Sequence, residues 1–108
     1  MSIYNLLKVG LDATDLRGKV ISNNVANINT PNYKRKYVSF EESLKGKMND
    51  KAKIEVKTDE DSIVRLDGNN IDLESEKVNQ AATTLQYNAL VNITNIKIAM
   101  IKSVISGR

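Results

Sequence analysis

Carboxylate and amide side chains gather around Gly68, and they are the first residues whose types suggest chemistry. Such oxygen ligands bind Ca²⁺ in an EF-hand loop, which has glycine at its sixth position. With Gly68 in that place, two ligand positions are held by Ile63 and Arg65, which carry no side-chain oxygen. The spacing therefore excludes an EF-hand and favours a capped turn that leads into a helix. That turn comprises Asp67, Gly68, Asn69, Asn70 and Asp72.

The chain lacks the residue types on which most catalytic and metal sites depend. Its 108 residues include no cysteine and no histidine, which excludes thiol chemistry, histidine-based catalysis and the usual zinc sites. The neighbouring carboxylates of Glu41 and Glu42 would point about 100° apart on a helix, whereas glycoside hydrolysis needs two carboxylates that face each other. We therefore expect no enzymatic activity, no catalytic residue, no cofactor and no metal.

Basic and aromatic residues alternate between Tyr33 and Tyr37, and Phe40 follows closely. Proteins that bind single-stranded nucleic acid combine stacking rings and cations in this way. The formal net charge is only +3, however, and the acidic segment after Thr58 would repel phosphate. We expect no nucleic-acid partner, with a weak nucleic-acid binder acting through this segment as the alternative.

Two long helices must position these residues. Apolar residues at helical spacing predict the first from Ser2, as N-cap, to about Asn29, within an N-terminal segment of residues 1–31. Its apolar positions from Leu7 onward alternate in steps of four and three, as in a coiled-coil seam. The helix should end at Thr30, because a residue before proline is disfavoured in the α region.

The second helix is predicted from Asp72 to about Ser106, within a C-terminal segment of residues 72–108. Asp72 can cap its N-terminus, and Gly107 lies where a helix stop is expected. Its last turns are apolar over more than a ~100° stripe, so we expect them to contact more than one neighbour. The apolar stripe comprises Val78, Ala82, Leu85, Ala89, Ile93, Ile96 and Met100.

Residues 32–71 lack a helical stripe and form a polar connector. Residues 53–57 alternate like a short strand, with residues 62–66 as a candidate partner. The predicted fold class is therefore mainly α: two long helices pair as a coiled-coil hairpin around a short irregular or β-hairpin middle. Because one helix pair leaves much of the C-terminal apolar face uncovered, we expect the isolated chain to be partly disordered. A small helical bundle and a small coiled-coil adaptor are the alternatives.

Asparagine is frequent between Asn23 and Asn32, although it disfavours a helix interior by several tenths of a kcal/mol. We expect Asn24 and Asn27 to hydrogen-bond a passing backbone and to set register, as a buried asparagine does in coiled coils. The residues that follow predict a turn. That turn comprises Asn29, Thr30, Pro31, Asn32 and Tyr33.

The sequence from Ile21 to Lys34, preceded by Leu11-Asp12-Ala13, closely resembles the N-terminal signature of bacterial flagellar rod, hook and hook-associated axial proteins. The sequence from Arg65 to Glu74, with Leu85-Gln86-Tyr87, resembles in particular the small subunits of the proximal rod. The family usually has glycine where this chain has Asn32, and asparagine tolerates the left-handed conformation next best.

The resemblance implies a structural subunit of the flagellar basal body rod, which polymerises with other rod proteins and connects the MS ring to the drive shaft for motility. The sister proximal-rod protein FlgC is the alternative within the family. The implied partners are rod proteins of the FlgC, FlgF and FlgG types, the adaptor FliE, the MS-ring protein FliF and the type III export apparatus.

The same resemblance implies export without a cleaved signal peptide, which agrees with a first segment that lacks the pattern of a signal peptide. The chain has no run of ~18 consecutive apolar residues, which a transmembrane helix would need. We therefore expect no direct membrane insertion. The assembly interface should lie on the two axial helices. It comprises Leu7, Leu11, Ile21, Asn24, Val25, Asn27, Ile28, Leu85, Ala89, Ile93, Ile96 and Met100.

Overall fold

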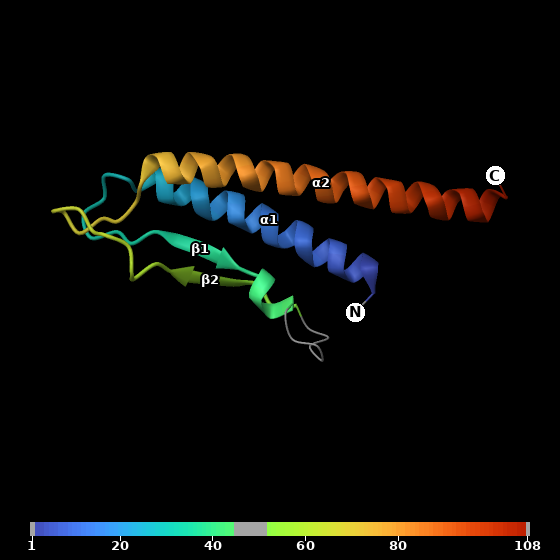
Figure 1. The fold of residues 1–108 in the computed structure, drawn as a ribbon, viewed down its shortest axis with the longest axis horizontal. Coiled ribbons are helices and arrows are strands. Elements are labelled where there is room, and N and C mark those ends of the chain that lie inside the picture. The colour runs from blue at the N-terminus through green and yellow to red at the C-terminus, as the bar shows by residue number, and fades with distance from the viewer. Residues whose placement is uncertain (1, 45–51, 108) are drawn as a thin grey trace.

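A computed structural model describes residues 2–44 and 52–107, and two antiparallel helices dominate it (Figure 1). A small antiparallel hairpin lies between them in the chain, which confirms the predicted mainly α fold. Part of the predicted connector, residues 45–51, lies outside the described residues. In chain order the elements are α1 (Ile3–Ala26), β1 (Lys36–Ser39), the 3-10 helix η1 (Glu41–Leu44), β2 (Glu55–Thr58) and α2 (Leu73–Ser106).

Both helices are capped by the residues that the sequence suggested. Ser2 and Asp72 accept hydrogen bonds from backbone N–H groups in the first turns of α1 and α2. Gly107 ends α2 in the left-handed conformation, with φ of 71°. The end of α1 comes earlier than predicted, with Asn27 as its C-cap rather than a residue near Asn29.

The hairpin differs from the predicted one. β2 overlaps the predicted strand at residues 53–57, but it pairs with β1, and Val38 lies opposite Val56. The proposed partner segment, residues 62–66, forms no strand, so that pairing is wrong. The physical reason is burial: Val38 and the adjoining Phe40 are buried in the core, and residues 62–66 are exposed.

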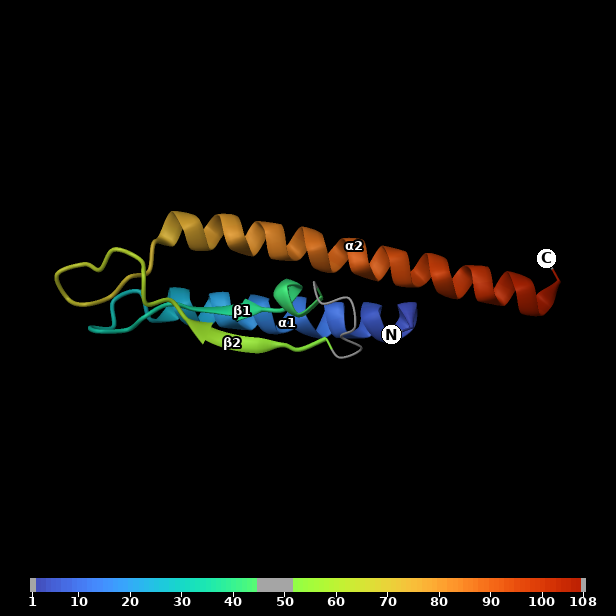
Figure 2. The ribbon, with the colours of Figure 1, turned by 60° about the horizontal axis from the view of Figure 1, so that its bottom comes forward.

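The hydrophobic core is small. Its buried apolar residues are Leu7, Ala13, Val20, Ile21, Val38, Phe40 and Ile71. The radius of gyration is 17.6 Å, whereas a compact chain of this length has about 13 Å. Both views show α2 continuing well past the N-terminus of α1 (Figures 1 and 2). At 1.5 Å per residue, α2 is about 15 Å longer than α1. Tyr4, near the start of α1, lines a groove together with Met100, Ile101, Val104 and Ile105 of α2.

Candidate assembly surface

The side of α2 that faces α1 is largely polar. Glu76 and Thr83 are its buried residues. Further along, Leu90 packs on Gly10, where an added Cβ would lie 3.4 Å from the nearest Leu90 carbon. Glu76, Thr83 and Leu90 recur every seven residues, as residues on one side of a coiled-coil helix do. The chain therefore pairs its helices through a seam on α2 that is polar at two of these three positions.

The apolar stripe predicted on α2 lies elsewhere on the helix and is exposed. Leu85 is 71% exposed and Ile96 is 59% exposed. The helices pair as the predicted hairpin. Within the stripe, Ala82 and Ala89 line grooves that residues of α1 also line, whereas Leu85, Ile93 and Ile96 are exposed. Beyond the stripe, Val104 and Ile105 are 82% and 80% exposed. Exposed apolar side chains gathered on one helix in this way are typical of a surface that contacts another molecule.

The central part of α2 is also free of charge, since no charged side chain occurs between Lys77 and Lys97. By length and composition α2 could cross a membrane: its most apolar 18-residue window has a mean hydropathy of 1.3, and none of it is buried. The amides of Asn88, Asn92 and Asn95 share one side of this segment. They leave α2 amphipathic rather than apolar all round, which is typical of a helix that packs against protein.

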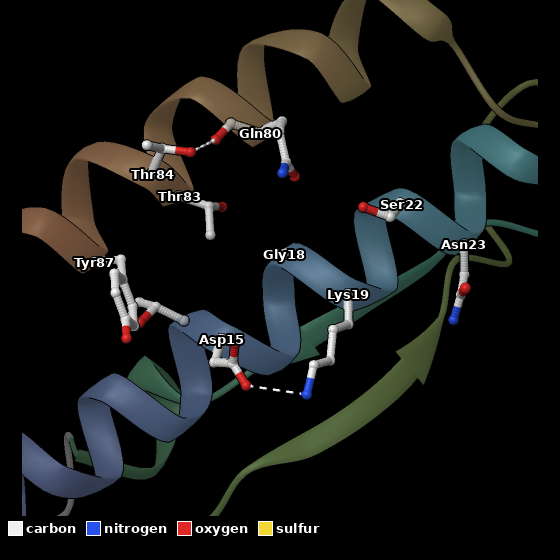
Figure 3. A pocket seen from close by; sticks show the side chains of 10 residues that line it. Asp15, Gly18, Lys19, Ser22, Asn23, Gln80, Thr83, Thr84 and Tyr87 are labelled. Carbon is white, nitrogen blue, oxygen red and sulfur yellow. Dashed lines mark hydrogen bonds and ion pairs between the residues drawn. The ribbon is translucent and has the colours of Figure 1, made fainter.

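A groove of about 420 Å³, lined mostly by residues with polar side chains, runs between the two helices (Figure 3). On its α1 side, Lys19 pairs with Asp15 at 3.2 Å, and Gly18 leaves open space where a side chain would point. On its α2 side, Thr83 and Tyr87 line the groove. The one ion pair in this lining lies entirely on α1, so the groove brings no charged groups of the two helices together.

A second groove, of about 390 Å³, is mostly apolar and lies where α1, η1 and α2 meet. Its lining includes Leu7, Phe40, Leu44, Ala89 and Leu90. Because Ala89 belongs to the exposed stripe as well, the groove and the stripe form adjoining parts of one apolar surface.

Beside this groove, Arg17 of α1 donates hydrogen bonds to residues of three other elements: β1, η1 and α2. Its guanidinium donates two hydrogen bonds to the carboxylate of Glu41, at 2.8 and 2.9 Å, which lower the pKa of Glu41. It also donates to the carbonyl of Val38 at 3.1 Å and to the side-chain oxygen of Gln86 at 3.2 Å. Arg17 was not among the predicted site residues, although a charged residue next to an apolar seam is a signal for such a role.

A buried polar cluster joins the helices at the end opposite the two termini. Glu76 is fully buried and accepts hydrogen bonds from Arg35 Nε at 2.9 Å and from Asn24 Nδ2 at 3.3 Å. Arg35 also pairs with Asp59 at 3.0 Å. Among residues 2–44 and 52–107, no buried side-chain nitrogen or oxygen lacks a hydrogen-bond partner. Neither Glu76 nor Arg35 was among the predicted site residues, because their spacing in the sequence gives no sign that they meet.

Asn24 of this cluster also hydrogen-bonds the backbone of its own chain. Its side chain donates to the carbonyl of Lys36 at 2.7 Å and accepts from the N–H of Lys36 at 2.9 Å. The expectation that Asn24 bonds a passing backbone is confirmed, and that backbone is β1 of its own chain. Asn27 instead donates to the carbonyl of Asn23 in its own helix at 2.8 Å.

The two predicted turns, at residues 29–33 and 67–72, pack against each other. The N–H of Asn32 donates to the carbonyl of Asp67 at 2.8 Å, and Asn69 donates to the carbonyls of Asn27 and Thr30 at 2.8 and 3.0 Å. Asn32 has a φ of 63°, so it holds the left-handed conformation that its place in the family motif implied. The carbonyl of Asn27 also accepts a hydrogen bond from the N–H of Thr30 at 3.0 Å, so the end of α1 is bonded both by its own turn and by Asn69.

The basic–aromatic segment uses its cations inside the chain. Lys34 donates to the carbonyl of Gly68, and Arg35 belongs to the buried cluster. The Arg35 guanidinium lies 5.6 Å from the ring centre of Tyr37. Lys36 and Tyr37 are exposed, and Tyr33 is half-buried.

The predicted interface residues differ in exposure. Leu7, Ile21 and Asn24 are buried, Leu11, Asn27 and Ile28 are half-buried, and Val25, Leu85, Ala89, Ile93, Ile96 and Met100 are exposed. The buried residues build the subunit itself. The exposed residues, five of which lie on α2, form the candidate assembly surface. The described residues contain no group of acidic side chains that could hold a metal ion.

Comparison with known proteins agrees with a role in assembly. Residues 9–34 match the family described as flagella basal body rod protein. The chain is 34% identical to the flagellar basal body rod protein FlgB of Bacillus subtilis (strain 168), across 94% of this chain and 91% of the relative. It is 33% identical to FlgB of Borrelia hermsii, across 77% of this chain and 80% of the relative. The chain therefore belongs to the FlgB family of flagellar basal body rod proteins.

Proposed function

We propose that the chain assembles into the proximal rod through the exposed apolar side of α2. As a member of its family, it is a structural component of the bacterial flagellar basal body and is located in the rod. The observation that carries the proposal is the orientation of α2, whose polar seam faces its own chain while its apolar stripe faces outward. Contacts between unlike surfaces that repeat without closing build a filament.

The proposed partners are other components of the basal body. Rod proteins of the FlgC, FlgF and FlgG types would cover the stripe, and FliE- and FliF-type proteins would hold the base of the rod at the MS ring. The type III export apparatus would deliver the subunit. What supports this set is the likeness to FlgB proteins over most of their length, which favours this function over that of the sister protein FlgC or of a free adaptor.

A charge placed in the stripe tests the proposal. Leu85→Asp or Ile96→Asp should abolish motility, because a carboxylate cannot be buried in an apolar contact without a partner. Secretion of the variant should continue, because the substitution lies on the surface of the folded subunit. Swimming in soft agar and the amount of variant protein in isolated basal bodies are the measurements.

Thr84→Asp is the matched control, because it adds the same charge one residue away on the polar side of α2. It should leave motility close to that of the wild type. Equal loss in both variants would show that the stripe is not the contact. Binding of the wild-type chain to lipid vesicles, lost in Leu85→Asp, would instead identify a membrane as the partner of the stripe.

A further inference from the structure

We propose that the buried cluster of Glu76, Arg35 and Asn24 fixes the rotation of α2 about its own axis and so keeps the apolar stripe facing outward. The inference rests on the proposed function, since it concerns how the subunit keeps its assembly surface available. It makes Glu76 a positioning residue for assembly: Glu76 acts through the orientation of a helix and contacts no partner itself.

The chain has an alternative arrangement that hydrophobic burial would favour. α1 carries apolar residues at coiled-coil spacing, among them Leu7 and Ile21, and α2 carries the stripe around Leu85 at similar spacing. Leu7 and Ile21 are already buried in the structure, so pairing with them would remove the stripe of α2 from water, which the hydrophobic effect favours. In the structure α2 instead turns Thr83 toward α1 and leaves Leu85 exposed. At about 100° per residue, Ala82 and Leu85 of the stripe point about 100° and about 160° away from Thr83, so the two arrangements differ by more than a quarter of a turn.

The cluster opposes that rotation because its partners come from separate elements. Asn24 belongs to α1, Arg35 directly precedes β1, and both donate to the same Glu76 carboxylate. Turning α2 far enough to bury Leu85 would carry Glu76 away from both donors. The fully buried Glu76 carboxylate would then lose both of its donors, which is costly for a buried charge. The Asn24 amide and the half-buried Arg35 guanidinium would each lose one acceptor.

Contacts further along α2 agree with one fixed orientation. Gln86 accepts a hydrogen bond from Arg17 at 3.2 Å, and Leu90 packs against Gly10. These two contacts would be replaced by others of similar strength after a rotation, because one is a neutral acceptor near the surface and the other is apolar. The charged and fully buried contact at Glu76 is the one that has no substitute.

The absence of cysteine allows a direct test, since a single introduced thiol reports on its own site. Thr83 is 5% exposed and Leu85 is 71% exposed, so in the otherwise unchanged full-length chain Leu85→Cys should react with a maleimide at least about tenfold faster than Thr83→Cys. Adding Glu76→Leu should reverse this order, because α2 then turns its stripe inward. Circular dichroism should show that the helix content is kept.

Glu74→Leu is the matched control. It removes a carboxylate from the same turn of α2, but the Glu74 side chain is 82% exposed and lies outside the cluster. The order of thiol reactivity should stay as in the wild type. A second variant, Glu76→Leu with Arg35→Leu, removes both members of this ion pair and should also reverse the order.

The inference is overturned if Thr83→Cys stays slow and Leu85→Cys stays fast in both the single and the double variant. It is overturned equally if both thiols become fast with loss of helix, since the cluster would then hold the fold rather than the rotation of α2. Equal reaction rates of the two thiols in the chain that retains Glu76 would overturn it as well. All rates are measured on the isolated chain, so they do not depend on whether the stripe binds rod proteins, and failure of the motility test leaves them unchanged.

Discussion

Asn69 and Asn70 lie side by side in the turn before α2, and each uses both ends of its amide. Asn69 donates to two backbone carbonyls and accepts from the N–H of Ile71 at 2.8 Å. Asn70 accepts from the N–H of Arg35 at 2.6 Å and donates to the carbonyl of Asp59 at 2.8 Å. An uncharged group with a donor and an acceptor can join two backbone segments that lack ladder hydrogen bonds. The asparagines of these turns thus stabilise the connector inside the subunit.

Gly68 should tolerate no side chain. Its φ is +86°, and an added Cβ would lie 3.1 Å from the Cα of Asn32 and closer still to the side-chain oxygen of that residue. Gly68→Ala should therefore lower the free energy of unfolding by about 1–3 kcal/mol. Urea denaturation followed by circular dichroism measures the change.

Gly18→Ala provides the contrast to Gly68→Ala. Gly18 lies inside α1, and no atom lies within 4 Å of the site of an added Cβ. Alanine there should raise the free energy of unfolding by roughly 0.5–1 kcal/mol, because glycine loses more entropy in a helix. A loss of stability at Gly18 as large as at Gly68 would contradict this account of both positions.

Asp59 should make the fold sensitive to acid. A hydrogen bond from the Ser62 hydroxyl, aided by Arg35, lowers the pKa of Asp59 to about 2. An unfolded aspartate has a pKa of about 3.9, so the folded state is favoured by the ionised carboxylate above that pH. This contribution is lost as the pH falls from about 4 to about 2.

Asp59→Asn removes the titrating group while keeping a similar shape. The melting temperature of the wild type should fall more steeply than that of the variant between about pH 4 and pH 2. Parallel curves for the two proteins over this range would show that Asp59 is not the group responsible.

At the scale of elements, the free end of α2 should be the least stable part of the isolated subunit. Residues near Glu76 are tied to α1 and β1, whereas Val104 and Ile105 contact little of the chain. Isolated helical turns are marginal in water without packing. Amide hydrogen exchange should therefore be fast after Lys97 in the isolated chain and slow in purified rods. Equal protection along all of α2 in the isolated chain would show that assembly adds no order.

The existence of both helices follows from the sequence, but the orientation of α2 does not. Periodicity and the caps at Ser2, Asp72 and Gly107 define where both helices begin and where α2 ends. Periodicity also shows that one side of α2 is apolar, yet it cannot show which molecule covers that side. Here the decisive contact is a single buried carboxylate, Glu76, whose partners come from distant parts of the chain.

The strand pairing escaped prediction for a related reason. Two strands of four residues each carry little pattern, and β1 lies in the segment whose basic and aromatic residues suggested a different role. What fixes β1 is burial of Val38 against the helices and the pair of hydrogen bonds between Asn24 and the backbone of Lys36. Such long-range contacts are invisible to local spacing. The motif from Asn23 to Lys34 could be interpreted from the sequence because one short stretch contains the end of α1, the turn that follows it and Asn24 of the buried cluster.

At the scale of the whole molecule, the subunit is an elongated body, with extents of 64, 29 and 14 Å. The turns lie at one end of the molecule and the hairpin lies beside α1. The part of α2 that extends past α1 forms the opposite end. A body of this shape buries little of its own apolar surface. It suits a member of a rod protein family, in which neighbouring subunits supply the contacts that a single chain does not.

The uncharged stretch of α2 between Lys77 and Lys97 bears on how contacts made by α2 respond to salt and acidity. Attraction between exposed charges weakens as salt shortens the Debye length from about 10 Å at 0.1 M to about 3 Å at 1 M. A joint made from aliphatic and amide groups has no charge to screen and none to titrate. In the assembly that we propose, contacts made by this stretch of α2 would depend less on salt and acidity than contacts made by ion pairs would.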